Sequence, residues 1–164
     1  MTLAPLLSAS PAIQAHVIAA MLAVLLLPLT LLRRRRDRVH RLAGYVWIGA
    51  MLITAISSFW INGIRLIGPF SPIHLLSVLT IGNVVWAVVE VRRGNIRAHE
   101  RILKGTAVWA LGVAGLLTLL PGRMMSVALF GGGQETGFAL AVVAVAALIF
   151  RGAIARRVRP RRHG

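Results

Sequence analysis

The feature that most constrains this fold is the alternation of long apolar runs with short clusters of arginine. Five apolar runs lie at about residues 11–32, 42–64, 72–91, 102–120 and 136–150. A helix that crosses a bilayer needs about 20 mostly apolar residues, because each residue adds only about 1.5 Å. The fifth run is short, and it reaches this length only if its helix begins within residues 131–133. The sequence therefore predicts an all-α, polytopic transmembrane helix bundle, with an up-and-down four-helix core and a fifth C-terminal span.

Composition supports this class and argues against several others. Hydrophobic residues make up 57% of the 164 residues and charged residues 14%, whereas a soluble domain averages about 45–50% apolar and about 25% charged residues. This balance argues against a water-soluble globule and against a disordered chain, which needs low hydrophobicity. The chain has no cysteine, which excludes a disulfide framework, a zinc ribbon, a cysteine-ligated iron–sulfur cluster and a cysteine nucleophile.

The basic residues predict how the helices thread through the membrane. The net charge is +15, and 17 of the 19 basic residues fall in the loops at 33–41 and 92–104 or in the tail at 151–162. The positive-inside rule places these segments in the cytoplasm. We therefore expect a multi-pass protein of the bacterial inner membrane with its N-terminus outside and its C-terminus in the cytoplasm. Arginine clusters placed in this way indicate topology and contacts with anionic lipid headgroups rather than nucleic-acid binding.

Short connections between the runs predict antiparallel helices in one membrane domain of residues 1–164. No basic residue precedes Arg33, so the first run lacks the charged start of a signal peptide and is expected to remain as a span. Small and polar residues recur at helical spacing along the second run and predict its interior face: His40, Ala43, Gly44, Trp47, Met51, Thr54, Ser58 and Asn62. Gly44 is expected at a helix contact, and Leu26 of the first run is expected to face lipid.

The third run contains a conflict between two polar residues. His74 and Asn83 are nine positions apart, and at about 100° per residue they lie on opposite faces of a helix. If Asn83 faces the interior, bonding for instance to Ser57 or Ser58, His74 does not, unless the helix bends near Gly82.

Four of the five histidines lie at the ends of the predicted spans. His16 and His74 belong near the outer ends of the first and third spans, and His40 and His99 near the inner ends of the second and fourth. In an up-and-down bundle these are diagonal pairs, and two facing histidines at one depth can ligate a haem iron axially. The layout is compatible with one haem b in each leaflet. The alternative is that each histidine only hydrogen-bonds a backbone carbonyl or a lipid headgroup.

Other catalytic sets are absent from the sequence, so no catalytic residue is predicted and an enzymatic activity stays open. Asp37, the only aspartate, lies in a basic loop, which leaves no Ser-His-Asp arrangement, and neither a zinc-protease helix motif nor a phosphate-binding loop is present. Glu90 is expected to pair with Arg92 or Arg93 at the inner boundary. A proton-coupled transporter would need an acid deep in a span, and the sequence has none.

Several stretches of the chain resemble a known family. They are HRLAGY at 40–45, SSF at 57–59, FSPIHLLS at 70–77, RAH at 97–99 and LLPGR at 119–123. Together they resemble the bacterial predicted-membrane-protein family known as domain of unknown function 2306, over about residues 16–123. The resemblance implies an integral membrane protein and no particular activity. The histidine layout is also similar, more loosely, to that of four-helix, two-haem membrane cytochromes of b type, a likeness that rests on helix pairing alone.

Two functions are compatible with these features. The first is a b-type cytochrome-like electron carrier, with His16/His74 and His40/His99 as haem-ligand pairs. The second is a non-enzymatic accessory or assembly subunit of a membrane complex, whose small-residue faces bind a partner helix or a second copy of the chain. The sequence leaves the redox partner, the oligomeric state and the physiological role open.

Overall fold

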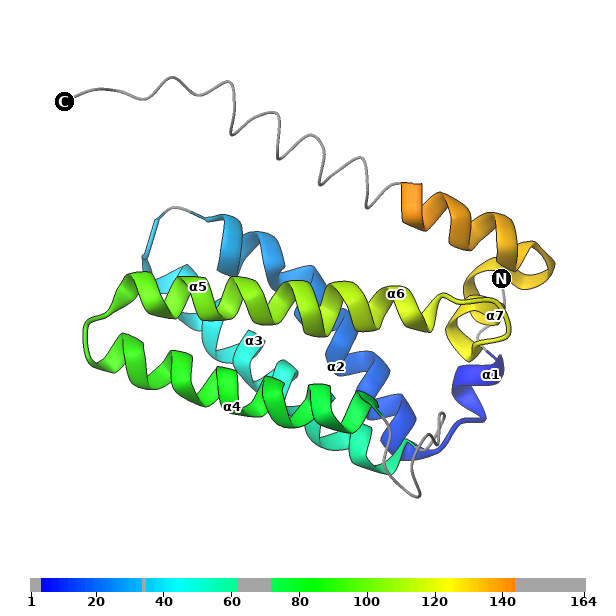
Figure 1. The fold of residues 1–164 in the computed structure, drawn as a ribbon, viewed down its shortest axis with the longest axis horizontal. Helices are drawn as coiled ribbons and strands as arrows, with labels where there is room; N and C mark the ends of the chain where they lie inside the picture. The colour runs from blue at the N-terminus through cyan, green and yellow to red at the C-terminus, as the bar shows by residue number, and fades with distance from the viewer. Residues whose placement is uncertain (1–3, 34, 62–71, 144–164) are drawn as a thin grey trace. The chain divides into compact units, whose positions relative to one another are not determined.

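The computed structural model describes residues 4–33, 35–61 and 72–143, which form helices joined by turns with no strand among them (Figure 1). The chain divides into two compact units, a bundle of residues 6–115 and a smaller unit that joins residues 1–5 to residues 116–164. The predicted all-α fold class is confirmed. The bundle contains all four candidate histidines and is described first.

Four long helical segments follow one another along the chain. The first is α2 (Pro11–Leu27), which continues through a π-helical turn (Pro28–Leu32), and the second is α3 (Arg38–Ser57), which continues through a 3-10 turn (Ser58–Trp60). The third is α4 (Pro72–Arg92). The fourth runs from α5 (Ile96–Thr106) through a π-helical turn (Ala107–Val113) into α6 (Ala114–Thr118). A short helix, α1 (Ala4–Leu7), precedes them.

Each segment is long and apolar enough to cross a membrane, with candidate spans at Pro11–Leu31, Arg38–Trp60, His74–Arg92 and Ile96–Thr118. These spans confirm the first four predicted ones. The second and fourth begin earlier than the apolar runs at 42 and 102, because polar caps set the helix starts. Residues 136–143 of the fifth run are helical. Residues 144–150 of that run, like residues 62–64 of the second, lie outside the described part of the chain, so a fifth span is not confirmed.

Two polar side chains cap the N-termini of the helices that carry His40 and His99. The Asp37 carboxylate accepts a hydrogen bond from the backbone N–H of His40 (3.0 Å), and the Asn95 side-chain oxygen accepts one from the N–H of Ala98 (3.2 Å). Both are N-cap interactions, which pair backbone donors that a helix start leaves free. They extend α3 and α5 beyond the apolar runs and into the basic loops.

The interior of the bundle combines one tryptophan with small side chains. Its buried core takes residues from all four segments: Ala23, Trp47, Ala50, Met51, Val84, Ala87, Leu103 and Ala107. Helix α2 packs along α3, α3 along α4 and α4 along α5, in the predicted up-and-down order (Figure 1). Alanines allow the backbones to approach, and this matters in a bilayer, where hydrophobicity gives no driving force between helices.

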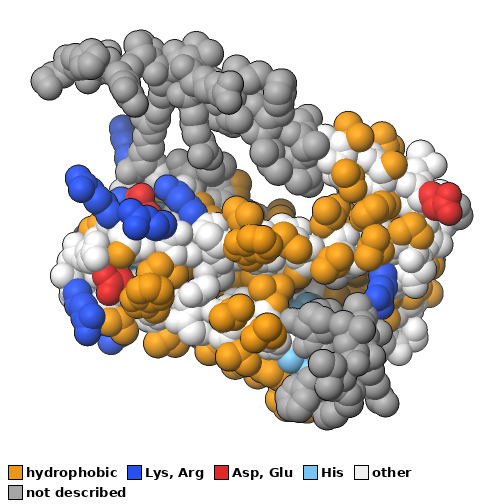
Figure 2. Space-filling view, in the orientation of Figure 1, with side chains coloured by type: hydrophobic (Ala, Val, Ile, Leu, Met, Phe, Trp, Pro, Cys, Tyr) orange, Lys and Arg blue, Asp and Glu red, His pale blue; other side chains and the backbone are white. Residues whose placement is uncertain are grey.

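The outward faces of the bundle are apolar, as a lipid-facing surface requires. Leu25, Trp86 and Trp109 are more than half exposed, and hydrophobic side chains cover much of the visible face (Figure 2). Leu26 does not belong to this surface. It packs against the buried core, so the prediction that Leu26 faces lipid is wrong by one helical position.

Four members of the predicted interior face of the second span are buried: Ala43, Trp47, Met51 and Ser58. The prediction for Gly44 is wrong. A Cβ atom at Gly44 would meet no atom within 4 Å, because this residue lies at the edge of the buried face and is only half-buried. The helix contact at this level is made by Trp47 instead.

On helix α4, the residue that faces the interior of the bundle is His74 rather than Asn83. The buried positions on this helix are His74, Ser77, Thr80, Val84 and Ala87. They recur at intervals of three or four residues and form one face. Asn83 is half-buried at the edge of that face. Ser58 is one of the two serines that were expected to bond to Asn83. It bonds to Ser77 instead, since the hydroxyl oxygens of Ser58 and Ser77 are 2.6 Å apart.

The smaller unit contains a short helix, α7 (Met124–Phe130), which continues through a 3-10 turn (Gly131–Gly133) into helical residues 134–143. The N–H of Gly122 donates to the side-chain oxygen of Gln134 (2.7 Å). Gly137 is buried against Phe130, where a Cβ atom would lie 2.3 Å from the ring. Glycine is therefore required for this close approach.

Candidate histidine sites at the two ends of the bundle

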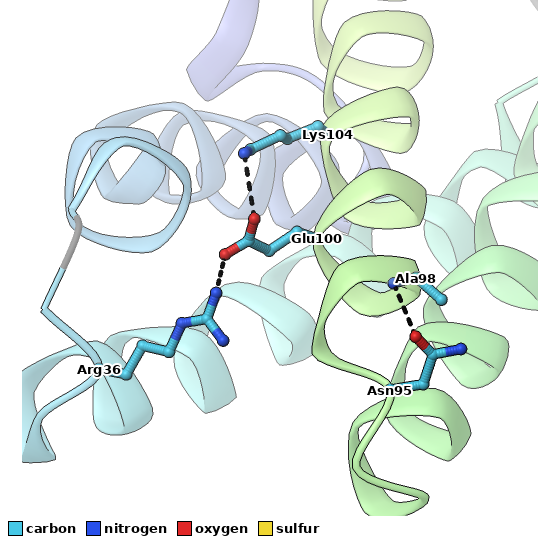
Figure 3. A network of polar contacts seen from close by, with 5 residues as sticks. All are labelled: Arg36, Asn95, Ala98, Glu100 and Lys104. Carbon is cyan, nitrogen blue, oxygen red and sulfur yellow. Dashed lines mark hydrogen bonds and ion pairs between the residues drawn. The ribbon is translucent and has the colours of Figure 1, made fainter. Parts of the chain in front are cut away.

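His40 and His99 lie at the same end of the bundle. His40 is three residues beyond the cap of α3, and His99 is four residues beyond the cap of α5. An ion pair between Arg36 and Glu100 joins the segment before α3 to the first turns of α5 (Figure 3). This contact brings the two helix starts, and with them the two histidines, to one level of the bundle.

The His99 ring is fixed against α4. Its Nδ1 atom is 2.9 Å from the carbonyl oxygen of Ala87, and because a carbonyl only accepts, Nδ1 carries the proton and donates. In a neutral imidazole this leaves the lone pair on Nε2. Ala87 also belongs to the core cluster that contains Trp47, so the His99 ring is anchored directly beside the packed interior.

Two ring nitrogens on α3 are buried without a hydrogen-bond partner in the described chain, His40 Nδ1 and Trp47 Nε1. The two residues are seven positions apart, about two helical turns, and share one face of α3. Trp47 is fully buried, and its indole N–H is a donor only. A buried donor that stays unpaired is costly, so this face of α3 is where an additional acceptor or ligand would be stabilising.

The loops at this end are held by short-range charge contacts. Arg33 pairs with Asp37, and this hydrogen bond, together with the one from the His40 N–H, lowers the pKa of Asp37 from 3.8 to about 2. Glu100 pairs with Arg36 and, at 3.5 Å, with Lys104 (Figure 3). Such exposed pairs contribute little individually.

The predicted partner of Glu90 is confirmed. Its carboxylate lies 3.8 Å from the Arg93 guanidinium and accepts a hydrogen bond from the Asn95 side-chain amide (2.6 Å). Glu90 therefore links the end of α4 to the cap of α5.

At the other end of the bundle, His16 contacts α3. Its Nδ1 atom is 3.2 Å from the Ser57 hydroxyl oxygen. That hydroxyl also lies 2.6 Å from the carbonyl oxygen of Ile53, to which it donates its single proton. Ser57 must then accept from His16, so Nδ1 again carries the proton and Nε2 the lone pair.

His74 is buried at this same end, with 7% of its surface exposed. Its ring stacks on Phe59, with ring centroids 5.5 Å apart and an angle of 19° between the planes. Ser57 and Phe59 both lie where α3 ends, so this short stretch contacts both His16 and His74. The structure thus assigns the four histidines to two ends, two to each, as predicted.

Sequence reasoning missed the side chains that hold these histidines. Ser57 and Phe59 belong to the SSF stretch that carried part of the family resemblance, and their proximity to histidines depends on helix packing. Asp37 and Asn95 carried a usable signal, since both residue types are preferred caps before a helix. Within the described residues, no group of three or more His, Cys, Asp or Glu side chains is placed to hold a metal ion.

Comparison with known proteins gives one family. A profile described as "Predicted membrane protein (DUF2306)" matches residues 13–159. No curated protein and no solved structure matches the chain. The match extends beyond the stretches recognised in the sequence and includes all four spans. With four helices able to cross a bilayer, this chain is an integral membrane protein and belongs to the family of predicted membrane proteins defined by domain of unknown function 2306.

Proposed function

We propose that this protein is a b-type cytochrome-like electron carrier in which His40 and His99 bind one haem at the inner end of the bundle. His16 and His74 bind a second haem at the outer end. The observation that carries the proposal is the pair of buried ring nitrogens, His40 Nδ1 and Trp47 Nε1, that have no hydrogen-bond partner in the described chain.

The residues present fit such a group. The haem iron binds imidazole nitrogen, so it would pair with a histidine ring nitrogen. The haem also carries carboxylates, which accept hydrogen bonds and would pair with an indole N–H. Metal-binding histidines commonly donate their other ring N–H to a carbonyl or another acceptor, which fixes the tautomer. His99 does this with Ala87 and His16 with Ser57, which leaves Nε2 as the ligand atom of each.

The two pairs act as separate sites. Trp47 and Met51 are fully buried in the middle of the bundle, and they fill the space between the inner and outer ends. Bound haem supplies a one-electron iron couple, and the role of the helices is to hold each imidazole and to exclude water around it. With both haems bound, this packed apolar layer would separate them.

The proposal is tested by counting haems. The full chain is expressed with ample haem, purified in mild detergent, and assayed by its Soret band and as the pyridine haemochrome. We expect two haems in the wild type and one after His40→Ala or His99→Ala, with the double variant no worse than either single variant, since both residues serve one iron. His16→Ala and His74→Ala should remove the other haem in the same way.

The matched control is His163→Ala, which removes the remaining histidine and should leave both haems. A colourless wild-type protein would overturn the proposal. The histidines would then serve as interfacial hydrogen-bonding residues, and the accessory or assembly subunit would become the leading function. If all five alanine variants lose haem equally, the loss reflects misfolding of the bundle, which thermal unfolding of each variant detects.

We also propose that the protein lies in a bacterial inner membrane with its N-terminus outside. The support is the position of 17 of the 19 basic residues in segments that the rule places on the cytoplasmic side. A reporter fused to the C-terminus should be active in the cytoplasm. Activity only on the outer side would contradict a cytoplasmic C-terminus, and with the N-terminus outside it is the result expected if residues 136–150 do not cross the membrane.

A further inference from the structure

An open groove lies on the outward face of α3 at its basic end. Its volume is about 300 Å³, and Arg38, Arg41, Leu42 and Tyr45 line it. These positions are spaced by three or four residues and so share one side of the helix. The side chains are exposed, with Leu42 at 67% and Tyr45 at 70%, and none of them takes part in the histidine sites.

The two arginines in the groove are not neutralised by the protein. The acids near this end have other partners: Asp37 pairs with Arg33, Glu100 with Arg36 and Lys104, and Glu90 with Arg93. No carboxylate in the described chain lies within ion-pair distance of Arg38 or Arg41. Basic side chains gather at this end of the bundle, next to apolar surface (Figure 2). The groove therefore presents two free guanidinium groups to an anion.

The chemistry of the groove changes along the helix axis. Arg38 lies at the first turn of α3, and Tyr45 lies seven residues further into the span, or about 10 Å along the axis. Beyond Tyr45 the same side of α3 exposes apolar residues, including Ile53 at 52% and Ile56 at 48%. Tyrosine is typical of the level of the lipid headgroups, where its ring is apolar and its hydroxyl is wet.

We propose that this groove binds the headgroup of an anionic phospholipid, with the phosphate on Arg38 and Arg41 and an acyl chain along Leu42, Tyr45 and the apolar face beyond. Arginine suits this role because its planar guanidinium can make two parallel hydrogen bonds to a phosphate. A soluble anion would use only the arginines, whereas a lipid also uses the apolar floor. The order of charge, aromatic ring and apolar surface matches the order of groups in a lipid.

The test measures lipid retained on the full chain by native mass spectrometry in mild detergent. The probes are phosphatidylglycerol and, as the neutral comparison, phosphatidylcholine. The wild type should retain one phosphatidylglycerol in preference to phosphatidylcholine. A basic residue near a membrane surface contributes about fivefold in affinity, so Arg38→Gln with Arg41→Gln should weaken phosphatidylglycerol binding by about thirtyfold. Arg41→Gln alone should weaken it by about fivefold.

The matched control removes two other exposed arginines from the same end, Arg92→Gln with Arg97→Gln. Neither pairs with a carboxylate in the described structure, so the charge lost is the same, and lipid retention should change little. An equal loss in both double variants would overturn the proposal, since the attraction would then be a general effect of net charge. Displacement of the lipid by excess inorganic phosphate would also overturn it, because the groove would then bind a free anion. Positively charged side chains near a helix N-terminus destabilise the helix, so removing the charges of Arg38 and Arg41 should not prevent folding. Thermal unfolding of this double variant in detergent checks that it folds.

Discussion

Ser58 and Ser77 offer the sharpest test of how the bundle is held together at the end that contains His16 and His74. Their hydroxyl oxygens are 2.6 Å apart, and the two side chains are 1% and 6% exposed. Ser58 also donates to the carbonyl oxygen of Ala55 (2.7 Å), so its oxygen accepts from Ser77. This is a hydrogen bond between the 3-10 turn that follows α3 and helix α4, and both side chains are buried.

The expected size of this bond is modest. Interhelical hydrogen bonds in membrane proteins contribute about 0.6 kcal/mol on average and about 1.7 kcal/mol at most, because the unfolded chain in the membrane also finds partners. The Ser58–Ser77 bond is buried and short, so we expect a coupling free energy in the upper half of that range. Serine to alanine removes the hydroxyl with little change of shape, so packing should contribute little to the difference.

The assay is a double-mutant cycle on the free energy of unfolding, measured by titrating the protein in mixed detergent micelles with dodecyl sulfate. Ser58→Ala, Ser77→Ala and the double variant give the coupling energy. The control is Thr80→Val, which removes a buried hydroxyl that bonds only to its own helix, at the carbonyl of Leu76 (2.8 Å), and should cost much less. A coupling energy within about 0.3 kcal/mol of zero would refute the reasoning.

Two further perturbations probe the smaller unit and the end of the bundle that contains His40. The pKa of Asp37 falls from 3.8 to about 2 through its bonds to Arg33 and the His40 N–H, so its contribution to stability is complete above about pH 4 and is lost as the pH falls toward 2. The melting temperature of Asp37→Asn should therefore be below that of the wild type at pH 6, and the gap should close by pH 2; a constant gap would contradict this. Gly137→Ala places a Cβ 2.3 Å from the Phe130 ring and should destabilise by about 1–3 kcal/mol, whereas Gly44→Ala, in open space, should be neutral or stabilising by about 0.5–1 kcal/mol. Equal melting temperatures for these two alanine variants would show that the ring moves freely.

The membrane class and the four spans could be predicted because they depend on properties that are local in sequence. An apolar run of about 20 residues predicts a span, and a cluster of arginines predicts its orientation, whatever the helix packs against. The face of the second span was also predictable, since Trp47 and Met51 recur at helical spacing. The first residues of the helices were less predictable, because the helices begin at polar N-cap residues such as Asp37 and Asn95, which lie outside the apolar runs.

The contacts of the histidines could not be predicted, because they depend on how helices rotate against each other. Gly44 and Leu26 show the limit: a rotation of one position moves a residue between contact and lipid, and in a bilayer both environments are apolar. The conflict between His74 and Asn83 was visible in the sequence. Its resolution needed the position of α4 against α3, where Ser77 meets Ser58 and His74 meets Phe59.

Polar side chains inside the bundle differ in whether their polar atoms find a hydrogen-bond partner within the described chain. From the sequence, the stripes of small and polar residues favour close helix packing over room for a ligand. In the structure, the hydroxyls of Thr54, Thr80 and Thr106 each donate to a carbonyl four residues earlier in the same helix (2.9, 2.8 and 2.9 Å). These stripes are thus satisfied internally and need no ligand. The His40 and Trp47 ring nitrogens lack such a solution, because no backbone acceptor of α3 lies within reach of their rings. Within the described chain, the support for a bound group therefore comes from these two ring nitrogens on α3 and not from the threonine hydroxyls.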